Sequence, residues 1–162
     1  MTRGLDAAAT RRAAYDLVSR KAWSRRELTA RLVHRGAPQA VAAQVVAELE
    51  SRGYVDDRAL ARQWVERRVA RERLGSRRLS EELRAKGIAS SLAEAAIREA
   101  FLETDEEARA LEAGHRRLAA LQRRNPGRAP LRLRDYLLRR GYPAEIVSRV
   151  VRQLLKVDTP EP

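Results

Sequence analysis

The sequence GSRRLSEELRAKGIASSLAEAAIREA, residues 75–100, contains a pattern that recurs on both sides of it. Two leucines four residues apart are followed by a basic residue, the glycine at position 87 and an apolar residue. The same arrangement surrounds Gly36, 51 residues earlier, and Gly141, 54 residues later. Three copies of one unit therefore make up most of the 162 residues, as in proteins built from stacked repeats.

Each copy is typical of two helices joined by a tight turn. Leucines four residues apart place one apolar stripe on the first helix, and the basic residue lies in its last turn, where the helix dipole favours a cation. A glycine such as Gly87 supplies the left-handed C-cap. The second helix begins at Pro38, at Pro143, or at a capping box formed by Ser91 and Glu94. Because each helix pair has one apolar side to bury, it must pack against a neighbour.

Capping signals place further helices along the chain. Asp6 is suited to cap an opening helix over residues 6–22, and Ser24 with Glu27 predicts a capping box for the first unit. Thr104 with Glu107 predicts another capping box. The helix that follows it is expected to end at the breaker cluster of residues 125–130, a candidate hinge.

A third helical pattern follows the first and second units. It starts beside Asp56 and Asp57, which resemble a metal or acid pair but are more typical of a helix N-cap and a first-turn charge. The apolar stripe of this helix is predicted to be buried and consists of Leu60, Ala61, Trp64, Val65 and Val69.

The predicted fold class is all-α: an N-terminal capping helix and a tandem array of three three-helix, helix-turn-helix-like repeats. The low aromatic content, 4%, favours helices packed through aliphatic side chains over a sheet. The predicted divisions are an N-terminal helix in residues 1–23, repeat 1 in 24–74, repeat 2 in 75–125, repeat 3 with two helices in 126–157, and a disordered tail in 158–162.

Composition limits the classes of function. The chain has 34 Lys and Arg against 22 Asp and Glu, a net charge of +12, so polyanions or an acidic protein surface are the expected partners. The absence of cysteine excludes disulfides and thiolate metal sites and favours a reducing cytoplasm. No window approaches the roughly 18 apolar residues that a membrane span needs. We expect a soluble cytoplasmic protein that does not bind membranes.

No arrangement of residues predicts catalysis, a cofactor or a metal. The sequence has no glycine-rich phosphate loop, and neither His34 nor His115 is placed as a base or a ligand, so both are interpreted as surface or boundary residues. Trp23 and Trp64 could stack on nucleic-acid bases. Trp64 is more consistent with a core position, whereas the two interpretations of Trp23 stay open. We therefore expect a protein that is not an enzyme.

Glycine turns between short helices also suggest a DNA-reading helix-turn-helix, in which the second helix enters the major groove. The second helices, PQAVAAQVVAELE and SSLAEAAIREAFLE, carry almost no basic residues, so contact with the phosphate backbone along a basic ridge is more plausible. The candidate filament- or DNA-binding residues are Arg25, Arg26, Arg31, Arg35, Arg67, Arg71, Arg77, Arg78, Arg84, Lys86, Arg116, Arg117, Arg123, Arg124, Arg128, Arg132, Arg134, Arg139 and Arg140.

The segments GYVDDRALARQWVERR and LGSRRLSEELRAKGI, with SRRELTARLVHRG before them and LRDYLLRRGYP after them, resemble the RecX family of bacterial recombinase regulators. The resemblance extends from about residue 19 to residue 155. Leu60 stands where the family more often has phenylalanine, and Ala37 is small for its apolar position; both differences concern packing.

The resemblance implies an elongated helical protein that binds the RecA filament on single-stranded DNA, lies in the filament's helical groove, and blocks filament extension or promotes disassembly. Recombinase, ATPase and coprotease activities would thereby be inhibited, and the SOS response, DNA repair and recombination affected. Single-stranded DNA is expected as a partner within the filament and as a weak ligand alone. The alternative is an autonomous, sequence-tolerant DNA-binding protein. No apolar seam is left unpaired, so we expect a monomer.

Overall fold

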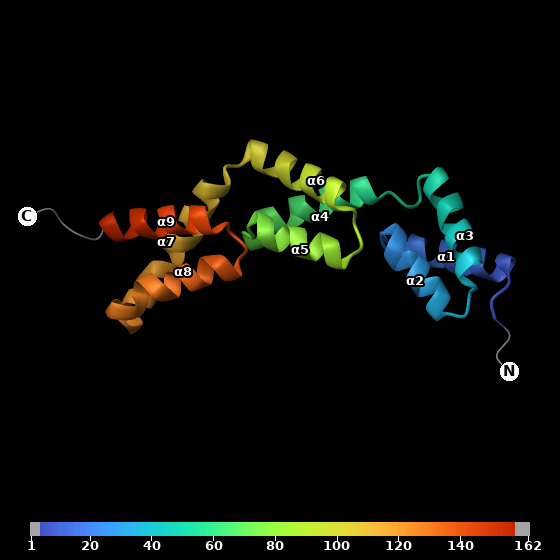
Figure 1. The fold of residues 1–162 in the computed structure, drawn as a ribbon, viewed down its shortest axis with the longest axis horizontal. Helices are drawn as coiled ribbons and strands as arrows, with labels where there is room; N and C mark the ends of the chain where they lie inside the picture. Colours follow the sequence, from blue (N-terminus) through green and yellow to red (C-terminus); the bar gives the residue numbers. More distant parts are fainter. Residues whose placement is uncertain (1–3, 158–162) are drawn as a thin grey trace, which may run out of the picture. The chain divides into compact units, whose positions relative to one another are not determined.

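The computed structural model describes residues 4–157, and this part of the chain is helical with no strand (Figure 1), which confirms the all-α prediction. The predicted tail, residues 158–162, lies outside the described residues. The helices are α1 (Ala7–Arg20), α2 (Arg25–His34), α3 (Gln39–Ser51), α4 (Asp57–Glu72), α5 (Ser76–Ala85), α6 (Ser90–Glu103), α7 (Glu106–Arg124), the 3-10 turn η1 (Pro126–Arg128), α8 (Ala129–Arg139) and α9 (Ala144–Val157).

The described residues form two compact units. The N-terminal unit consists of residues 4–63 and 83–93, and the C-terminal unit of residues 64–82 and 94–157. The boundaries between the units run through helices α4, α5 and α6, so each of these helices contributes to both units.

The core of the N-terminal unit is built by α1, α2 and α3, which pack on one another. The predicted caps are present: the Asp6 carboxylate accepts a hydrogen bond from the Ala9 amide at 2.7 Å, and Ser24 forms its capping box with Glu27. Each helix then turns one aliphatic stripe inward, as its spacing of apolar residues predicts. The buried side chains include Ala14, Leu17, Leu28, Leu32, Val45, Val46 and Leu49.

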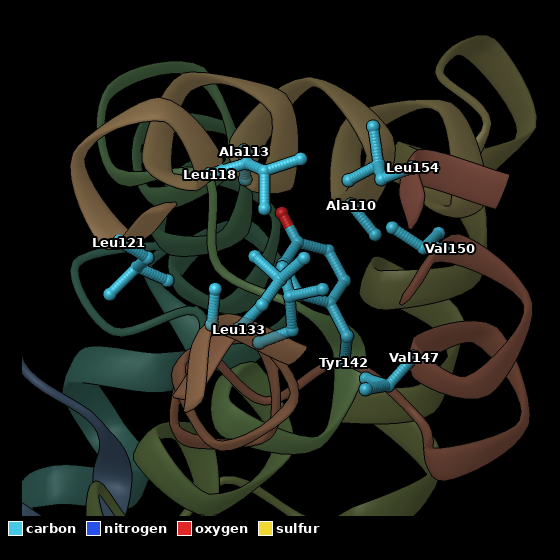
Figure 2. Close-up of a cluster of buried hydrophobic side chains, with 11 residues drawn as sticks. Ala110, Ala113, Leu118, Leu121, Leu133, Tyr142, Val147, Val150 and Leu154 are labelled. Atoms are coloured by element: carbon cyan, nitrogen blue, oxygen red, sulfur yellow. The ribbon is translucent and has the colours of Figure 1, made fainter. Parts of the chain in front are cut away.

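The core of the C-terminal unit surrounds one tyrosine. Helices α7, α8 and α9 pack pairwise, and Tyr142, in the turn between α8 and α9, lies fully buried among their aliphatic side chains (Figure 2). Leu133 contributes from α8 and Val150 from α9. A large amphipathic side chain therefore fills this core and brings a hydroxyl group into it, which must find a hydrogen-bond acceptor.

The glycine turns have the predicted left-handed backbone, with φ of 98° at Gly36, 77° at Gly87 and 87° at Gly141. Two of them also touch another helix. A Cβ atom at Gly87 would lie 2.5 Å from Cδ of Arg26, and one at Gly141 would collide with the backbone of Arg78. Glycine is thus required at these two positions by contact as well as by conformation.

Three predicted helix boundaries are wrong in detail. The α6 helix begins at Ser90, so Ser91 lies within its first turn and does not cap it. The α7 helix is capped by Asp105, whose carboxylate accepts from the Glu107 amide at 3.1 Å, and not by Thr104. A neighbouring carboxylate is an equally suitable acceptor for a free helix amide. The breaker cluster is also shorter than expected: Asn125 caps the turn η1, and Pro130 belongs to the first turn of α8, where proline is well tolerated.

Each unit contains one junction in which a glycine turn meets the start of a distant helix. In the N-terminal junction, Ser24 Oγ donates to the carbonyl of Lys86, which precedes Gly87. In the C-terminal junction, the Gly75 amide donates to the carbonyl of Arg140 at 2.8 Å. Ser24 and Gly75 occupy equivalent places in the repeat, so the contact recurs with different chemical groups.

An acidic residue adds a second bond to each junction. The Arg25 amide donates to Asp57 Oδ1 at 2.9 Å, and the Ser76 amide donates to Glu106 Oε1 at 2.6 Å. Burial raises the pKa of Asp57 although its bond to Arg25 opposes the shift. Asp56 caps its own helix through the Ala59 amide, and Asp57 lies in the first turn of that helix, so the pair is an N-cap and a first-turn charge, as predicted. The division into repeats at residues 24, 75 and 126 stays a proposal.

Candidate binding surface

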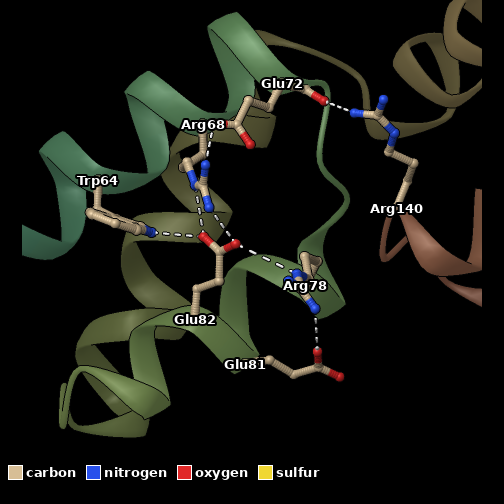
Figure 3. Close-up of polar contacts among 7 residues, drawn as sticks. All are labelled: Trp64, Arg68, Glu72, Arg78, Glu81, Glu82 and Arg140. Carbon is tan, nitrogen blue, oxygen red and sulfur yellow. Dashed lines mark hydrogen bonds and ion pairs between the residues drawn. The ribbon is translucent and has the colours of Figure 1, made fainter.

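A network of polar contacts joins α4 to α5 in the C-terminal unit (Figure 3). Trp64 donates its indole N–H to Glu82 Oε2 at 3.0 Å, and Arg68 binds both carboxylate oxygens of Glu82, at 2.8 and 2.6 Å. Burial of Glu82 acts to raise its pKa, but the bonds from Arg68 and Trp64 outweigh burial and lower it. The Glu82 carboxylate is therefore held ionised by its partners.

The prediction that Trp64 belongs to the buried apolar stripe is wrong. Leu60, Ala61, Val65 and Val69 are buried, but Trp64 is only half-buried. Guanidinium groups lie near its ring, with Arg68 Cζ at 5.2 Å from the ring centroid and Arg67 Cζ at 5.8 Å. The indole N–H requires an acceptor, and Glu82 provides it at the edge of the core. Trp23 is also half-buried, with Lys21 Nζ 3.9 Å from its ring centroid.

Three side chains, one from α7 and two from the turn between α8 and α9, bind the carbonyls at the end of α4. Arg109 donates to the Val69 carbonyl, and Arg140 donates to the Glu72 carbonyl. The buried Tyr142 hydroxyl donates to the carbonyl of Arg73 at 2.7 Å, and burial raises the pKa of Tyr142 to about 12. Carbonyls at a helix C-terminus lack partners within the helix, so these bonds fix the end of α4.

Some of the predicted binding residues have carboxylate partners. The N···O distances are 3.6 Å for Arg25 with Glu50, 3.7 Å for Lys86 with Glu27, 3.5 Å for Arg78 with Glu82, and 2.8 Å for Arg116 with Glu112. Ion pairs at exposed sites contribute about 0–1 kcal/mol each to stability. They therefore orient the side chains but bind them only weakly.

Most of the other predicted arginines form no ion pair within residues 4–157. In the N-terminal unit these are Arg26, Arg31, Arg35 and Arg84. In the C-terminal unit they are Arg71, Arg77, Arg117, Arg123, Arg124, Arg128, Arg132, Arg134 and Arg139, while Arg140 binds a carbonyl and Arg67 lies near Trp64.

Five of these arginines form a group that we call the α7–α8 basic edge: Arg123, Arg124, Arg128, Arg132 and Arg134. All are exposed, and they lie on the end of α7, on η1 and on the first turns of α8. The bend between two packed helices thus brings together charges that are close in sequence. Five unpaired guanidinium groups on one bend attract polyanions.

Among residues 4–157 we find no candidate for a metal site or a membrane-spanning helix. Both His34 and His115 are exposed, as predicted. Within the part of the chain that the structure describes, no group of three His, Cys, Asp or Glu side chains could hold a metal. No helix formed by residues 4–157 is long and apolar enough to span a membrane. The sequence prediction did not identify Arg73, Arg109 or Tyr136 as residues of interest, and nothing in their local sequence marks them.

The fold and its surface define a helical protein of repeated glycine-linked helix pairs with an unpaired basic edge. A family model described as RecX, second three-helix domain, matches residues 56–97. The regulatory protein RecX of Streptomyces coelicolor is 37% identical over 134 residues, which are 82% of this chain and 70% of that protein. The regulatory protein RecX of Thermobifida fusca is 35% identical over 151 residues, or 90% of this chain and 81% of that one.

Solved structures agree with these relatives. The crystal structure of RecX from Lactobacillus salivarius superimposes with a TM-score of 0.77 at 18% identity, and the match covers 93% of this chain and 97% of that one. The chain belongs to the RecX family of regulatory proteins.

Proposed function

We propose that this chain regulates a RecA-type recombinase by binding its filament on single-stranded DNA, in the helical groove of the filament. Binding inhibits the ATPase, strand exchange and coprotease activities by blocking filament extension or by promoting disassembly. The protein acts in the cytoplasm, as a monomer and without a catalytic centre or cofactor. Membership of a family of regulatory proteins supports this proposal.

The observation that carries the proposal is the α7–α8 basic edge. Its guanidinium groups have no carboxylate partner within residues 4–157, so they are available to a phosphate backbone or to an acidic protein surface. A filament of protein on DNA presents both. Paired arginines such as Arg25 and Arg78 contribute less, because a carboxylate already shares their charge.

The test is a recombinase ATPase assay on single-stranded DNA with this protein titrated in. The wild-type chain is expected to inhibit, and the triple variant Arg123→Gln, Arg124→Gln, Arg128→Gln is expected to need a roughly tenfold higher concentration, with a weaker salt dependence. The control is Arg58→Gln, Arg98→Gln, Arg152→Gln, which removes the same charge from three exposed arginines elsewhere. Equal inhibition by the two triple variants would contradict the role of the basic edge.

The alternative function is autonomous, sequence-tolerant DNA binding, which the net charge of +12 also favours. Fluorescence anisotropy at about 150 mM salt distinguishes the two. Weak binding to bare single strands together with tight binding to the filament supports the regulator. Equal affinity for both supports the autonomous DNA-binding protein.

A further inference from the structure

A cavity of about 380 Å³ lies in the C-terminal unit between the end of α4, α7 and α8. Its volume falls in the lower part of the range of roughly 300–1,000 Å³ in which ligand pockets are found. Arginines from three segments line it, namely Arg71, Arg73, Arg116 and Arg140, together with Glu72 and Tyr136. The cavity is distinct from the α7–α8 basic edge, none of whose residues line it.

The charge of the lining favours an anion. Four arginines face one carboxylate, which gives the lining a net charge of +3. Glu112, which binds Arg73 at 3.5 Å and Arg116 at 2.8 Å, reduces this to +2. Arg71 is exposed and has no partner within residues 4–157. Arg140 donates one N–H to the Glu72 carbonyl and forms no ion pair within residues 4–157.

The aromatic ring of Tyr136 lies close to two guanidinium groups, of which that of Arg140 lines the cavity. The guanidinium of Arg140 lies 5.3 Å from the ring centroid and that of Arg117 lies 5.6 Å from it, both within the range of a cation–π contact. A guanidinium fixed before a ligand arrives loses less side-chain entropy on binding. Tyr136 is therefore a positioning residue for this cavity.

The backbone at the rim is strained. Arg73 has φ of 49° and is the one non-glycine residue with positive φ among residues 4–157. This left-handed conformation is unfavourable for a residue with a Cβ atom. The Tyr142 hydroxyl holds the Arg73 carbonyl and thereby keeps the turn in place. Strain of this kind is concentrated at functional sites, and here it places one more arginine at the cavity.

The geometry points to a phosphate group as the ligand. A carboxylate offers two coplanar oxygens, which one guanidinium fork can satisfy. Guanidinium groups that line one cavity from α4, from α7 and from the residue after α8 suit an anion with oxygens in several directions. Arg116 at the cavity and Arg123 at the basic edge are seven residues apart on α7, which is two turns on one face of the helix. One nucleic-acid strand could therefore contact both, and this favours a phosphate within such a strand.

We propose that this cavity binds the phosphate group of a nucleotide, with Arg71, Arg73, Arg116 and Arg140 as ligands and Tyr136 as the residue that positions Arg140. The nucleotide belongs to a single strand or is a free nucleoside triphosphate, and the experiment separates these sources. The proposal deepens the proposed function, since a strand held here would continue along the α7–α8 basic edge.

The test measures binding of a labelled oligo-dT by anisotropy over a series of salt concentrations, with ATP and inorganic phosphate as competitors. Arg71→Gln is expected to weaken binding about fivefold to tenfold and to reduce the slope of log affinity against log salt by about 0.7, the value for one lost phosphate contact on a single strand. Arg98→Gln, an exposed arginine on α6, is the matched control and is expected to bind like wild type.

A second variant guards against misfolding. Arg73→Gly removes the guanidinium while glycine accepts the left-handed backbone without strain, so the fold is retained and the same loss of affinity is expected. Tyr136→Leu is expected to weaken binding less than Arg71→Gln and to leave the salt slope unchanged, because the cations remain but are no longer fixed.

The outcomes separate this proposal from the proposed function. If both arginine variants bind oligo-dT and ATP like the Arg98 control, the phosphate site is wrong, whereas inhibition of the recombinase is read independently in the ATPase assay. Binding of a fluorescently labelled ATP, measured by the same anisotropy assay, with no binding of oligo-dT supports a free nucleotide as the ligand. Failure of wild type to bind either one overturns the phosphate site even where the ATPase assay shows inhibition.

Discussion

The two junctions occupy the same place in the repeat but are built differently. In the N-terminal junction a serine hydroxyl, Ser24 Oγ, reaches the Lys86 carbonyl, and a salt bridge from Lys86 to Glu27 lies beside it. In the C-terminal junction the bonds come from the backbone: the Gly75 amide binds the Arg140 carbonyl, and the Arg77 amide binds the Gly141 carbonyl at 3.0 Å.

The C-terminal junction also has a second layer that the N-terminal one lacks. Arg78 packs against Gly141 and lies 3.5 Å from Glu82, which in turn binds Arg68 and Trp64. At the place of Glu82 the first copy has Arg31, which is exposed and has no partner within residues 4–157. One sequence pattern therefore allows a sparse junction and a dense one, and the dense one adjoins the arginine-lined cavity.

The largest effect is expected from closing the space at the dense junction. Gly141→Ala combines a left-handed backbone with a collision against the Arg78 backbone, and it should lower the free energy of unfolding by about 2–4 kcal/mol. Gly53→Ala is the matched control, since Gly53 has φ of 80° and nothing within 4 Å of an added Cβ. It should cost only about 1 kcal/mol. If urea unfolding gave the same loss of free energy for Gly141→Ala and Gly53→Ala, the contact between Gly141 and Arg78 would be shown to be unimportant.

Removing the buried hydroxyl tests the bond from Tyr142 to α4. Tyr142→Phe leaves the Arg73 carbonyl without its donor and should lower stability by about 1–3 kcal/mol at neutral pH. Tyr15→Phe removes an exposed hydroxyl that accepts from Arg52, and it should change stability by less than about 0.5 kcal/mol.

The same substitution has an alkaline signature. Burial raises the pKa of Tyr142 from 10.0 to about 12. The contribution of the neutral hydroxyl to the free energy of unfolding is therefore complete below pH 10 and is lost as the pH rises toward 12. Unfolding curves of wild type and Tyr142→Phe should therefore converge above pH 10. A difference in free energy of unfolding between wild type and Tyr142→Phe that stays constant over this pH range would contradict a buried, neutral tyrosine.

The ionic layer of the dense junction should give a smaller effect. Glu82→Gln keeps the shape of the side chain but loses its charge, and it should lower stability by about 1–2 kcal/mol at pH 7. Because the pKa of Glu82 is lowered, its contribution is present above the ordinary value of 4.5 and is lost as the pH falls through the folded value. The difference from wild type should thus shrink by pH 3, whereas Glu81→Gln, at an exposed site, should have little effect at either pH.

The smallest effect is expected at the sparse junction. Ser24→Ala removes a helix cap and the donor to Lys86, and it should cost about 1 kcal/mol in thermal unfolding. Ser51→Ala removes an exposed hydroxyl bonded within its own helix and serves as the control. A loss at Ser24 as large as that at Gly141 would remove the distinction between sparse and dense junctions.

The helices could be predicted because their signals are local. Leucine spacing, Ser24 with Glu27, and a glycine after a basic residue each act within one or two turns, so helix bounds and left-handed turns followed from the sequence. Thr104 was mistaken for the α7 cap because Asp105 beside it serves equally well. Trp64 was misplaced because an apolar stripe does not reveal which large side chain also needs an acceptor.

The candidate site was less predictable because the partners of its arginines are distant in sequence. Arg140 binds the carbonyl of Glu72, and Tyr142 binds that of Arg73, across more than 60 residues. No local pattern distinguishes such an arginine from an unpaired one such as Arg123. Positive φ at Arg73 was equally hidden, because arginine gives no sign of a left-handed turn and the tyrosine that holds it lies in another helix pair.

The order in which the chain is synthesised determines when the C-terminal junction can form. The amides of Gly75 and Arg77 donate to carbonyls at positions 140 and 141, and the carbonyl of Arg73 accepts from a hydroxyl at position 142. These partners are synthesised more than 60 residues later. A nascent chain that has reached the end of α7 therefore already contains Glu106, the acceptor of the Ser76 amide, but it still lacks the acceptors of the Gly75 and Arg77 amides. Co-translational folding would close this junction only after the turn at Gly141 has left the ribosome, and a chain cut before that turn would lose the closure altogether.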